Sequence, residues 1–294
     1  MTFLTYLTSG LGLGSVYAII ALGYTMVYGI AKMLNFAHGD VIMVGAYIAF
    51  YSTSSFGLPA WLSVIVAMAF CTLLGIIIER LAYKPLRGAT SLAVLITAIG
   101  VSYFLQNAAL LAWGSAPKVF TSLFAKIESF KFFDGQLVIS PETIFTVLAC
   151  IIIMLVLTFF TAKTKMGKSM RAVSEDNGAA QLMGINVNST ISMTFAIGSA
   201  LAAVAGVLLC SSYPTLMPTT GAMPGIKAFT AAVFGGIGSI PGAMIGGLVL
   251  GIIEIFARAY VSTELSDAIV FGVLIIVLLV KPTGLLGKKI HEKV

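Results

Sequence analysis

Charged side chains are scarce in this sequence. Only 10% of its 294 residues are Asp, Glu, Lys or Arg, whereas 59% are hydrophobic. The mean hydropathy is accordingly high, at +1.05. A soluble domain carries about 25% charged residues, and a soluble fold with so few charges would expose large apolar patches. The composition therefore excludes an ordinary soluble protein and indicates a chain whose solvent is the lipid bilayer.

Residues for redox, metal or nucleotide chemistry are also few. Gly167-Lys168-Ser169 resembles the end of a phosphate-binding loop, but Ala162 stands where that pattern needs glycine. His38 has no other His or Cys nearby, which makes a poor metal site. We expect no catalytic site, no metal and no cofactor bound by this chain. The cysteines are isolated in apolar stretches and are expected to be buried small hydrophobic residues: Cys71, Cys150 and Cys210.

Long apolar runs dominate the rest of the chain. They are continuous rather than alternating, and a helix needs about 20 such residues to cross a bilayer. We predict an all-α, polytopic bundle of about eight transmembrane helices, some of them broken or re-entrant, in a single domain covering 1–294. The predicted spans are 10–31, 40–52, 59–79, 90–113, 142–162, 190–212, 240–258 and 265–281. A further segment, 222–237, is too short and Gly-rich to assign as a full span.

The distribution of basic residues predicts the orientation of the chain. Residues 1–31 contain no Lys or Arg, so we expect no cleavable signal peptide and an external N-terminus. Lys and Arg gather in two short loops and the C-terminal tail, which are expected to face the cytoplasm. This orientation requires 222–237 to cross or re-enter the membrane. The residues concerned are Arg80, Lys84, Arg87, Lys163, Lys165, Lys168, Arg171, Lys281, Lys288, Lys289 and Lys293.

The loop at about 163–189 contains a predicted amphipathic helix. Ser174 is a suitable N-cap, with Glu175 and Asp176 in the first turn near the positive end of the helix. Gly184 is placed to end the helix in the left-handed conformation. Such a helix either lies along the lipid headgroups or docks into a groove on a partner protein, and the residue pattern fits both. The predicted apolar face consists of Ala179, Leu182 and Met183.

Polar residues inside membrane segments mark the other candidate sites, because they usually face a bundle interior or an aqueous cavity. Asn35, His38 and Asp40 interrupt one segment, where they either cap a helix break or line a path. Glu254 has Arg258 four residues on, so the two either form a structural ion pair or serve transport. Lys227 is expected to extend from the broken segment toward the membrane surface.

Five ordered motifs resemble one transporter family. LNFAHGDVIMVGAY, ERLAYKPLRG, GKSMRAVSEDNGAAQLMGIN, GGIGSIPGAMIGGLVLGIIE and KPTGLLG look like the LivH-type permease subunits of branched-chain amino-acid ABC importers. The resemblance implies a multi-pass permease of the bacterial inner membrane. It also implies a second related permease, two cytoplasmic ATPases that use ATP and magnesium, and an external substrate-binding protein as partners.

The resemblance also suggests functional residues. The GAAQLMGI stretch is similar to the family's ATPase-contacting loop, which favours docking over the membrane-surface alternative. Broken helices in the two halves of a transporter often line its path, so we expect the breaks near 35–40 and 221–242 to open and close it. The expected docking residues are Arg171, Glu175, Ala179, Ala180, Leu182 and Gly184. The expected path residues are Asn35, His38, Asp40, Gly235, Gly236, Gly238 and Glu254.

Two other classes of transporter are compatible with the same composition. An ion-coupled secondary amino-acid transporter would need a coupling carboxylate, for which Asp40 and Glu254 are the candidates. A permease or channel for urea or short amides is the second alternative.

Overall fold

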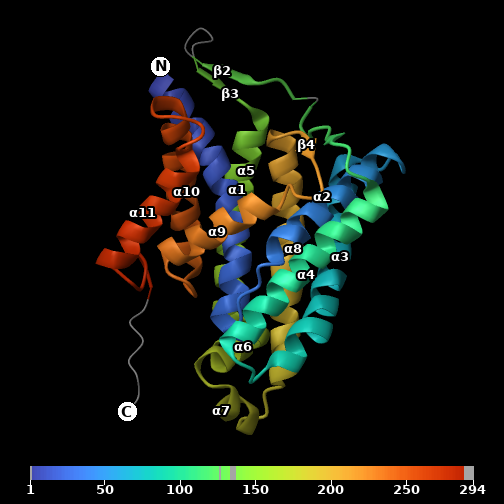
Figure 1. The fold of residues 1–294 in the computed structure, drawn as a ribbon, viewed down its shortest axis with the longest axis vertical. Helices are drawn as coiled ribbons and strands as arrows, with labels where there is room; N and C mark the ends of the chain where they lie inside the picture. Colours follow the sequence, from blue (N-terminus) through green and yellow to red (C-terminus); the bar gives the residue numbers. More distant parts are fainter. Residues whose placement is uncertain (1, 126, 133–136, 288–294) are drawn as a thin grey trace.

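The computed structural model describes residues 2–125, 127–132 and 137–287 and is predominantly helical (Figure 1). Each of the eight predicted spans is a helix, and 222–237 forms a ninth, shorter one. Six of these helices, including α3 with its continuation to Leu86, are long and apolar enough to cross a membrane. Of the basic tail residues, Lys288, Lys289 and Lys293 lie outside the described residues. The bundle helices are α1 (Thr2–Ala31), α2 (His38–Ser54), α3 (Ala60–Ile78), α4 (Ser91–Trp113), α5 (Pro141–Lys163), α8 (Val187–Ser212), α9 (Ala222–Gly235), α10 (Ile240–Tyr260) and α11 (Ser266–Val280).

Short elements cover the two ends of the bundle. At the end that holds the N-terminus, β1 (Lys118–Val119) pairs with β4 (Thr215–Leu216), and β2 (Phe130–Phe132) pairs with β3 (Leu137–Ile139), both antiparallel. The opposite end holds α6 (Lys165–Glu175) and α7 (Asn177–Leu182), as Figure 1 shows. A π-helical turn, η1 (Glu79–Tyr83), and a 3-10 turn, η2 (Lys84–Leu86), follow α3. The bundle therefore has short strands at one end and short helices at the other.

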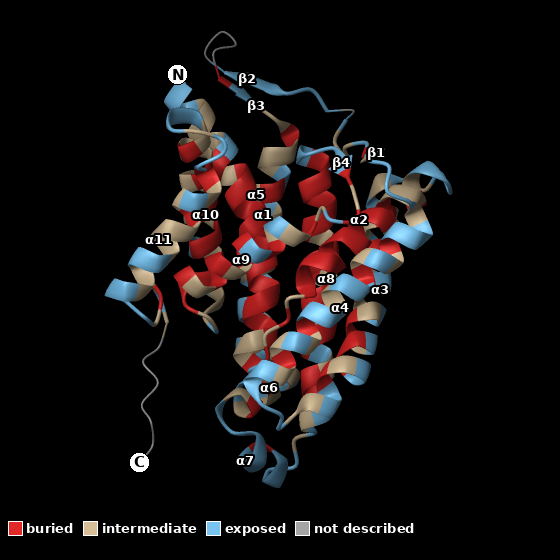
Figure 2. Ribbon diagram, in the orientation of Figure 1, coloured by how far each residue is buried: buried red, intermediate tan, exposed pale blue. Residues whose placement is uncertain are grey.

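Burial divides the bundle into a core and an apolar rim. Helix α1 is the centre of the core, with nearly all of its apolar stretch buried, and α10 and α8 pack beside it (Figure 2). The cysteines Cys71, Cys150 and Cys210 are buried and unpaired, as the sequence predicted. Helices α3, α4 and α5 instead expose large apolar side chains such as Phe70, Phe104 and Phe159. Because an outward apolar surface is stable only in an apolar solvent, this rim fits a bilayer.

Helix α9 is too short to cross a membrane alone. Its 14 residues extend about 21 Å at 1.5 Å per residue, against a hydrocarbon core of about 30 Å. Non-helical residues 217–221 lead from β4 into α9, and residues 236–239 lead out into α10. A similar interruption, residues 32–37, separates α1 from α2. The two breaks expected from sequence are thus real interruptions of the helices.

Glycine contacts hold α1 against α10. A Cβ atom on Gly14 would lie 2.8 Å from the Cα of Leu248, and one on Gly10 would lie 2.9 Å from the Cα of Ile252. Gly251 in turn packs directly on the backbone of Gly14. These distances are too short for a real Cβ, so glycine permits the close approach of the two backbones, as small residues commonly do in membranes.

Replacing Gly251 with alanine is therefore expected to destabilise the bundle by about 1–3 kcal/mol, because the added methyl group overlaps the backbone of α1. Gly272→Ala in α11 is the matched control, since nothing lies within 4 Å of its Cβ position. Thermal unfolding of both variants in detergent checks the prediction. Equal stability of the two variants would show that α1 and α10 can move apart without a loss of stability.

Candidate functional site

The N-terminal ends of α2 and α9 touch inside the bundle. A Cβ atom on Gly225 would lie 2.8 Å from the Cα of Gly39, and one on Gly39 would lie 2.6 Å from the carbonyl oxygen of Gly221. Only glycine allows two helix ends to approach this closely. The breaks near 35–40 and 221–242, which lie far apart in the sequence, therefore meet in the structure. Helix N-termini carry partial positive charge from their free N–H groups, so this junction gathers two of them.

Asn35 and Asp40 are buried on either side of this junction and bind different helices. The hydroxyl of Tyr83, in η1, donates a hydrogen bond of 2.9 Å to Asn35 Oδ1. Gln106 Nε2, from α4, donates to Asp40 Oδ1 at 2.9 Å. The N-cap of α2 is Ala37, and no side chain caps that helix. The capping alternative for these residues is therefore wrong, because they connect α2 and its leading segment to neighbouring helices.

His38 lies in the core beneath the same break. Its ring packs on Tyr24, with 4.6 Å between the ring centroids. A Cβ on Gly23 would lie 2.6 Å from His38 Nε2, so the glycine makes room for the imidazole. Within the described part of the chain Nε2 has no hydrogen-bond partner. The side chain is 1% exposed, so the structure places it in a tight packing position rather than at a cavity wall.

The glycines that follow α9 form a packed turn. Gly236 and Gly238 adopt positive φ values of 103° and 93°, a region that favours glycine. Gly235 packs against Gly242, and the backbone N–H of Leu286 donates to the Gly235 carbonyl at 2.9 Å. These three predicted path residues thus close the end of α9 against α10 and the C-terminal segment.

A small cavity of about 10 Å³ lies between this turn and the junction. It has room for a single water-sized molecule, so an amino acid does not fit. Its wall includes Tyr24, Asn35, Phe229 and Ile237. This cavity is therefore too small to be an open path for an amino acid.

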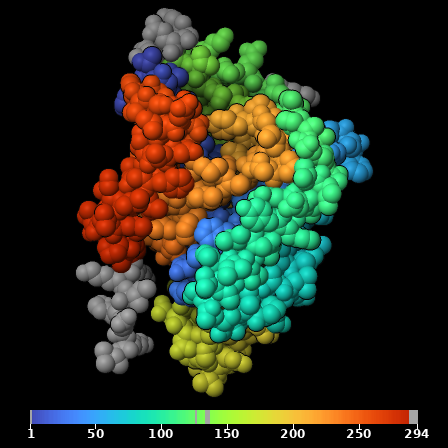
Figure 3. All heavy atoms as spheres, in the orientation of Figure 1, coloured from blue at the N-terminus to red at the C-terminus, as the bar shows by residue number. Residues whose placement is uncertain are grey.

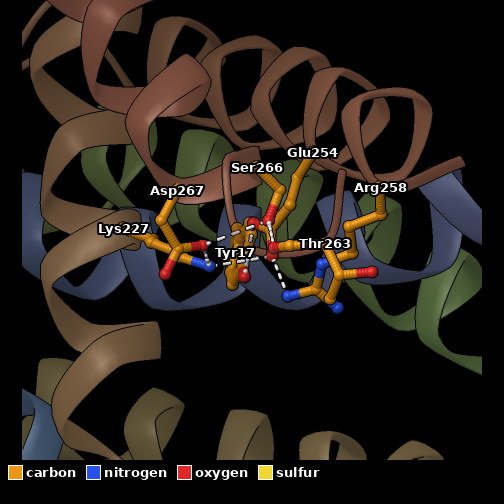
Figure 4. A network of polar contacts seen from close by, with 7 residues as sticks. All are labelled: Tyr17, Lys227, Glu254, Arg258, Thr263, Ser266 and Asp267. Atoms are coloured by element: carbon orange, nitrogen blue, oxygen red, sulfur yellow. Dashed lines mark hydrogen bonds and ion pairs between the residues drawn. The ribbon is translucent and has the colours of Figure 1, made fainter. Parts of the chain in front are cut away.

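Glu254 belongs to a buried ionic network (Figure 4). Its carboxylate accepts a hydrogen bond from Tyr17 Oη at 2.9 Å and forms an ion pair with Lys227 Nζ at 2.8 Å. It also pairs with Arg258, as the i,i+4 spacing suggested. Lys227 is 4% exposed and contacts Asp267 at 2.6 Å as well. The prediction that Lys227 reaches toward the membrane surface is wrong.

This network has two cations and two anions from three helices. Lys227 lies on α9, Glu254 and Arg258 on α10, and Asp267 on α11. Balanced charge is what buried ionic groups require. Glu254 and Arg258 therefore form a structural ion pair, which is one of the two alternatives that the sequence left open. The network also connects the short helix α9 to α10 and α11. Sequence spacing found the Arg258 partner but not Lys227 or Asp267.

The loop at 163–189 forms two helices instead of one. Asp176 is the N-cap of α7 and accepts from the N–H groups of Gly178 and Ala179 at 2.8 and 2.9 Å. The predicted cap, Ser174, instead lies near the end of α6 and bonds to the Arg171 carbonyl. Glu175 is the last residue of α6. Gly184 has a φ of 81° and ends α7 in the left-handed region, as predicted.

Helix α7 projects from the end of the molecule, and most of its residues are exposed (Figure 2). Leu182 and Met183 are 90% and 82% exposed, whereas Ala180 is 3% exposed and faces the bundle. Arg171 is exposed and donates to the Ala162 carbonyl at 3.2 Å. Of the expected docking residues, Ala180 is thus unable to form an outer surface, while Ala179 and Leu182 are available.

A second polar network, not predicted from sequence, connects the start of α8, near α6 and α7, to the break before α2. Buried Glu79 pairs with Arg87 and accepts from Ser192 Oγ at 2.6 Å. Arg87 also donates to Asn188, in the first turn of α8. Tyr83 follows in the same π-helical turn as Glu79 and binds Asn35. A π-bulge often marks a functional position, but its sequence, ERLAY, carries no recognisable signal for one.

Replacing Tyr83 with phenylalanine leaves the buried Asn35 oxygen without its donor. We expect a loss of stability of about 1–3 kcal/mol, the cost of an unsatisfied buried polar group. Tyr103→Phe on exposed α4 is the control, since Tyr103 is 63% exposed. Thermal unfolding in detergent distinguishes the two, and equal midpoints would contradict the assigned hydrogen bond.

Comparisons with known proteins cover nearly the whole chain. A family model described as "Branched-chain amino acid transport system / permease component" matches residues 6–278. The chain is 47% identical over 303 residues to the "High-affinity branched-chain amino acid transport system permease protein LivH" of Salmonella typhimurium, covering 99% of this chain and 98% of the relative. It is 46% identical over 307 residues to the corresponding protein BraD of Pseudomonas aeruginosa, with the same coverage of 99% and 98%.

A solved structure has a similar fold. "PsaBC from Streptococcus pneumoniae in complex with Fab" aligns with a TM-score of 0.52 at 16% identity, covering 96% of this chain and 93% of that chain. At this identity the likeness concerns the arrangement of helices alone.

Proposed function

Because this chain belongs to the family of branched-chain amino acid transport permease components, we propose that it is the membrane permease of an ATP-driven importer for branched-chain amino acids in the bacterial inner membrane. The observation that carries the proposal is the full-length similarity to permeases named for this transport. The apolar rim of α3, α4 and α5 supports a multi-pass membrane location. The N-terminus would face outward, and α6 and α7, next to the basic loops, would face the cytoplasm.

The hydrolysis of ATP belongs to partner subunits in this proposal. Two cytoplasmic ATPases would use ATP and magnesium and would bind the exposed apolar side chains of α7, since an unpartnered apolar helix face suits a protein groove. A second related permease would pack beside this one. Helix α9 reaches the surface between α11 and α4 in Figure 3, and its Met223 and Ile226 are about two-fifths exposed, so that face can line a shared path. An external binding protein would deliver the amino acid.

Movement of the ATPases would be transmitted to the path through a chain of hydrogen bonds and one ion pair. Helix α7 precedes α8, whose first turn binds Arg87 through Asn188. Arg87 holds Glu79 in the π-helical turn, and Tyr83 in that turn holds Asn35 in the break before α2. A shift of α7 would thereby be transmitted to the junction of α2 and α9. When that junction opens, the helix N-termini would stabilise the substrate carboxylate, and Phe229 and Phe36 would accommodate its apolar side chain.

Uptake by proteoliposomes tests the proposal. Vesicles that contain both permeases and the ATPases, with ATP inside and binding protein outside, should accumulate radiolabelled leucine, isoleucine or valine against a gradient. Accumulation should require ATP and the binding protein and should survive an uncoupler. Uptake that an uncoupler abolishes would identify an ion-coupled transporter, and ATP-independent equilibration of urea would identify a channel. The pairing of Glu254 with two cations argues against that residue as a coupling carboxylate, because its charge is already neutralised, and leaves Asp40 as the candidate for the first alternative.

A further inference from the structure

A second cavity, much larger than the closed one at the break, lies beside α7. Its volume is about 340 Å³, within the range of small-molecule sites. The end of α1, the loop before α4 and the starts of α7 and α8 surround it. Its wall includes Lys32, Met33, Arg87, Ser91, Asn177 and Ile191. Tyr28, Met33 and Leu34 line both this cavity and the small one at the break. In the proposed orientation the larger cavity lies on the cytoplasmic side.

The cavity has an excess of positive charge. Lys32 is exposed and, within the described part of the chain, forms no ion pair. Arg87 also lies in the wall, but its terminal nitrogens bind Glu79 and Asn188, so Lys32 is the cation available to a ligand. Among the residues that the structure describes, no Asp or Glu lines the cavity. The first residues of the long helices α4 and α8, Ser91 and Val187, also lie in its wall and add partial positive charge.

The position of Lys32 is unusual for its residue type. Its φ of 56° places it in the left-handed region at the end of α1, and it is the only non-glycine residue with a positive φ in the described chain. Glycine is the residue that normally ends a helix this way. A lysine there incurs a cost in backbone strain, and conformations of this kind gather at ligand-binding positions. The strained residue is also the unpaired cation of the cavity.

Much of the remaining wall is apolar, and this restricts the chemical class of the ligand further. Met33, Leu34, Val94 and Ile191 line the same space as Lys32. A ligand that satisfies both surfaces has an anionic group and a short apolar body. An ammonium group on that ligand would find no acidic partner, so a simple carboxylate fits better than an amino-acid zwitterion.

We propose that this cavity binds a short branched-chain monocarboxylate from the cytoplasm and that its occupation slows transport. The carboxylate would bind Lys32 beside the N-terminal ends of α4 and α8, and the apolar body would contact Met33 and Ile191. The wall includes Asn177 of α7 and the residue pair Arg87–Asn188, so a bound ligand restrains the elements through which the ATPases would act. This inference rests on the proposed transport function, because it assigns that function a regulator: the carboxylate that remains when the transported amino acid loses its amino group.

Proteoliposomes with the complete transporter, external binding protein and internal ATP provide the test. The lumen is preloaded with 4-methylpentanoate, 4-methyl-2-oxopentanoate, leucine or acetate at equal concentration, and the initial rate of labelled leucine uptake is measured. We expect the two branched carboxylates to inhibit strongly, leucine weakly, and acetate not at all. Lys32→Asn, which keeps a residue tolerant of the left-handed region, should raise the half-inhibitory concentration about tenfold, the effect of losing one charge-assisted hydrogen bond.

Lys84→Asn is the matched control, because it removes one charge from a neighbouring turn that does not line the cavity. It should retain wild-type inhibition. Inhibition that is absent in the wild type, or that is equal in Lys32→Asn, overturns the proposal. So does inhibition that follows the anionic-lipid content of the vesicles instead of the carboxylate. If the vesicles show no ATP-dependent uptake even without carboxylate, the proposed transport function is wrong. This result differs from normal uptake without inhibition, which contradicts the regulatory site alone.

Discussion

Replacing Glu254 with alanine is expected to prevent stable folding of the permease. The carboxylate is fully buried and pairs with Lys227 and Arg258. Its removal leaves Arg258 without its ion-pair partner and Lys227 with only the partly exposed Asp267. Removing one partner of a buried ion pair costs about 3–5 kcal/mol, which is a large part of the stability of a typical protein. Purified yield and thermal unfolding in detergent measure the effect.

Asp267→Asn is the control within the same network. Its carboxylate is 39% exposed, and Lys227 would keep Glu254 as a partner, so the loss should be much smaller. The double variant Lys227→Met with Glu254→Gln should recover part of the stability, because it removes the most deeply buried charge of each sign. If Glu254→Ala unfolds at the same temperature as Asp267→Asn, the network carries little of the stability of the bundle.

Introducing glutamate at Leu182 is expected to abolish ATPase binding and transport without affecting the fold. Leu182 is 90% exposed, so the change disturbs no internal contact, whereas a charge in a desolvated docking surface is strongly unfavourable. A central interface residue contributes about 2–4 kcal/mol, which corresponds to a loss of affinity of about 30-fold to 1,000-fold. Co-purification of the ATPases and ATP-dependent uptake are the two measurements.

Two further variants make this test specific. Gln181→Glu adds the same charge on the exposed side of α7 beside Leu182, and it shows how much of the effect comes from charge alone. Ala180→Glu is unsuitable, because Ala180 is buried and the change would disrupt the packing of α7 on the bundle. Normal co-purification of the ATPases with Leu182→Glu would remove α7 from the docking surface.

The helical framework was predictable because its signal is local. An apolar run long enough to cross the bilayer has few alternatives to a helix, and the predicted span 142–162 corresponds closely to α5, Pro141–Lys163. The left-handed end at Gly184 was predictable for a similar reason, since glycine has a conformational freedom that other residues lack.

The start of α7 was not predictable from local sequence. Ser174 and Asp176 are both good N-caps and lie two residues apart. The choice between them depends on α6, which continues to Glu175 because Met170 and Val173 pack into the bundle. Tertiary packing therefore extends α6 past Ser174, and α7 begins only after Asp176.

The polar networks were the least predictable part of the site. The Glu254–Arg258 pair follows from helical spacing, but Lys227 is 27 residues from Glu254, and Tyr83 is 48 residues from Asn35. Such pairs form only after the helices have packed. The sequence identified individual polar residues as costly in a membrane without showing which partner satisfies each of them.

The attachment of the chain's last described segment to α9 has a practical consequence. The N–H groups of Leu285 and Leu286 donate to the carbonyls of Phe234 and Gly235, each at 2.9 Å, so the C-terminal segment and the end of α9 are mechanically one piece. A bulky fusion close to this segment would disturb the position of α9. Because the other end of α9 holds Gly225, the disturbance would extend to the junction with α2. Fluorophores and purification handles are therefore better attached through the N-terminal end, where α1 begins with exposed residues at the opposite side of the molecule.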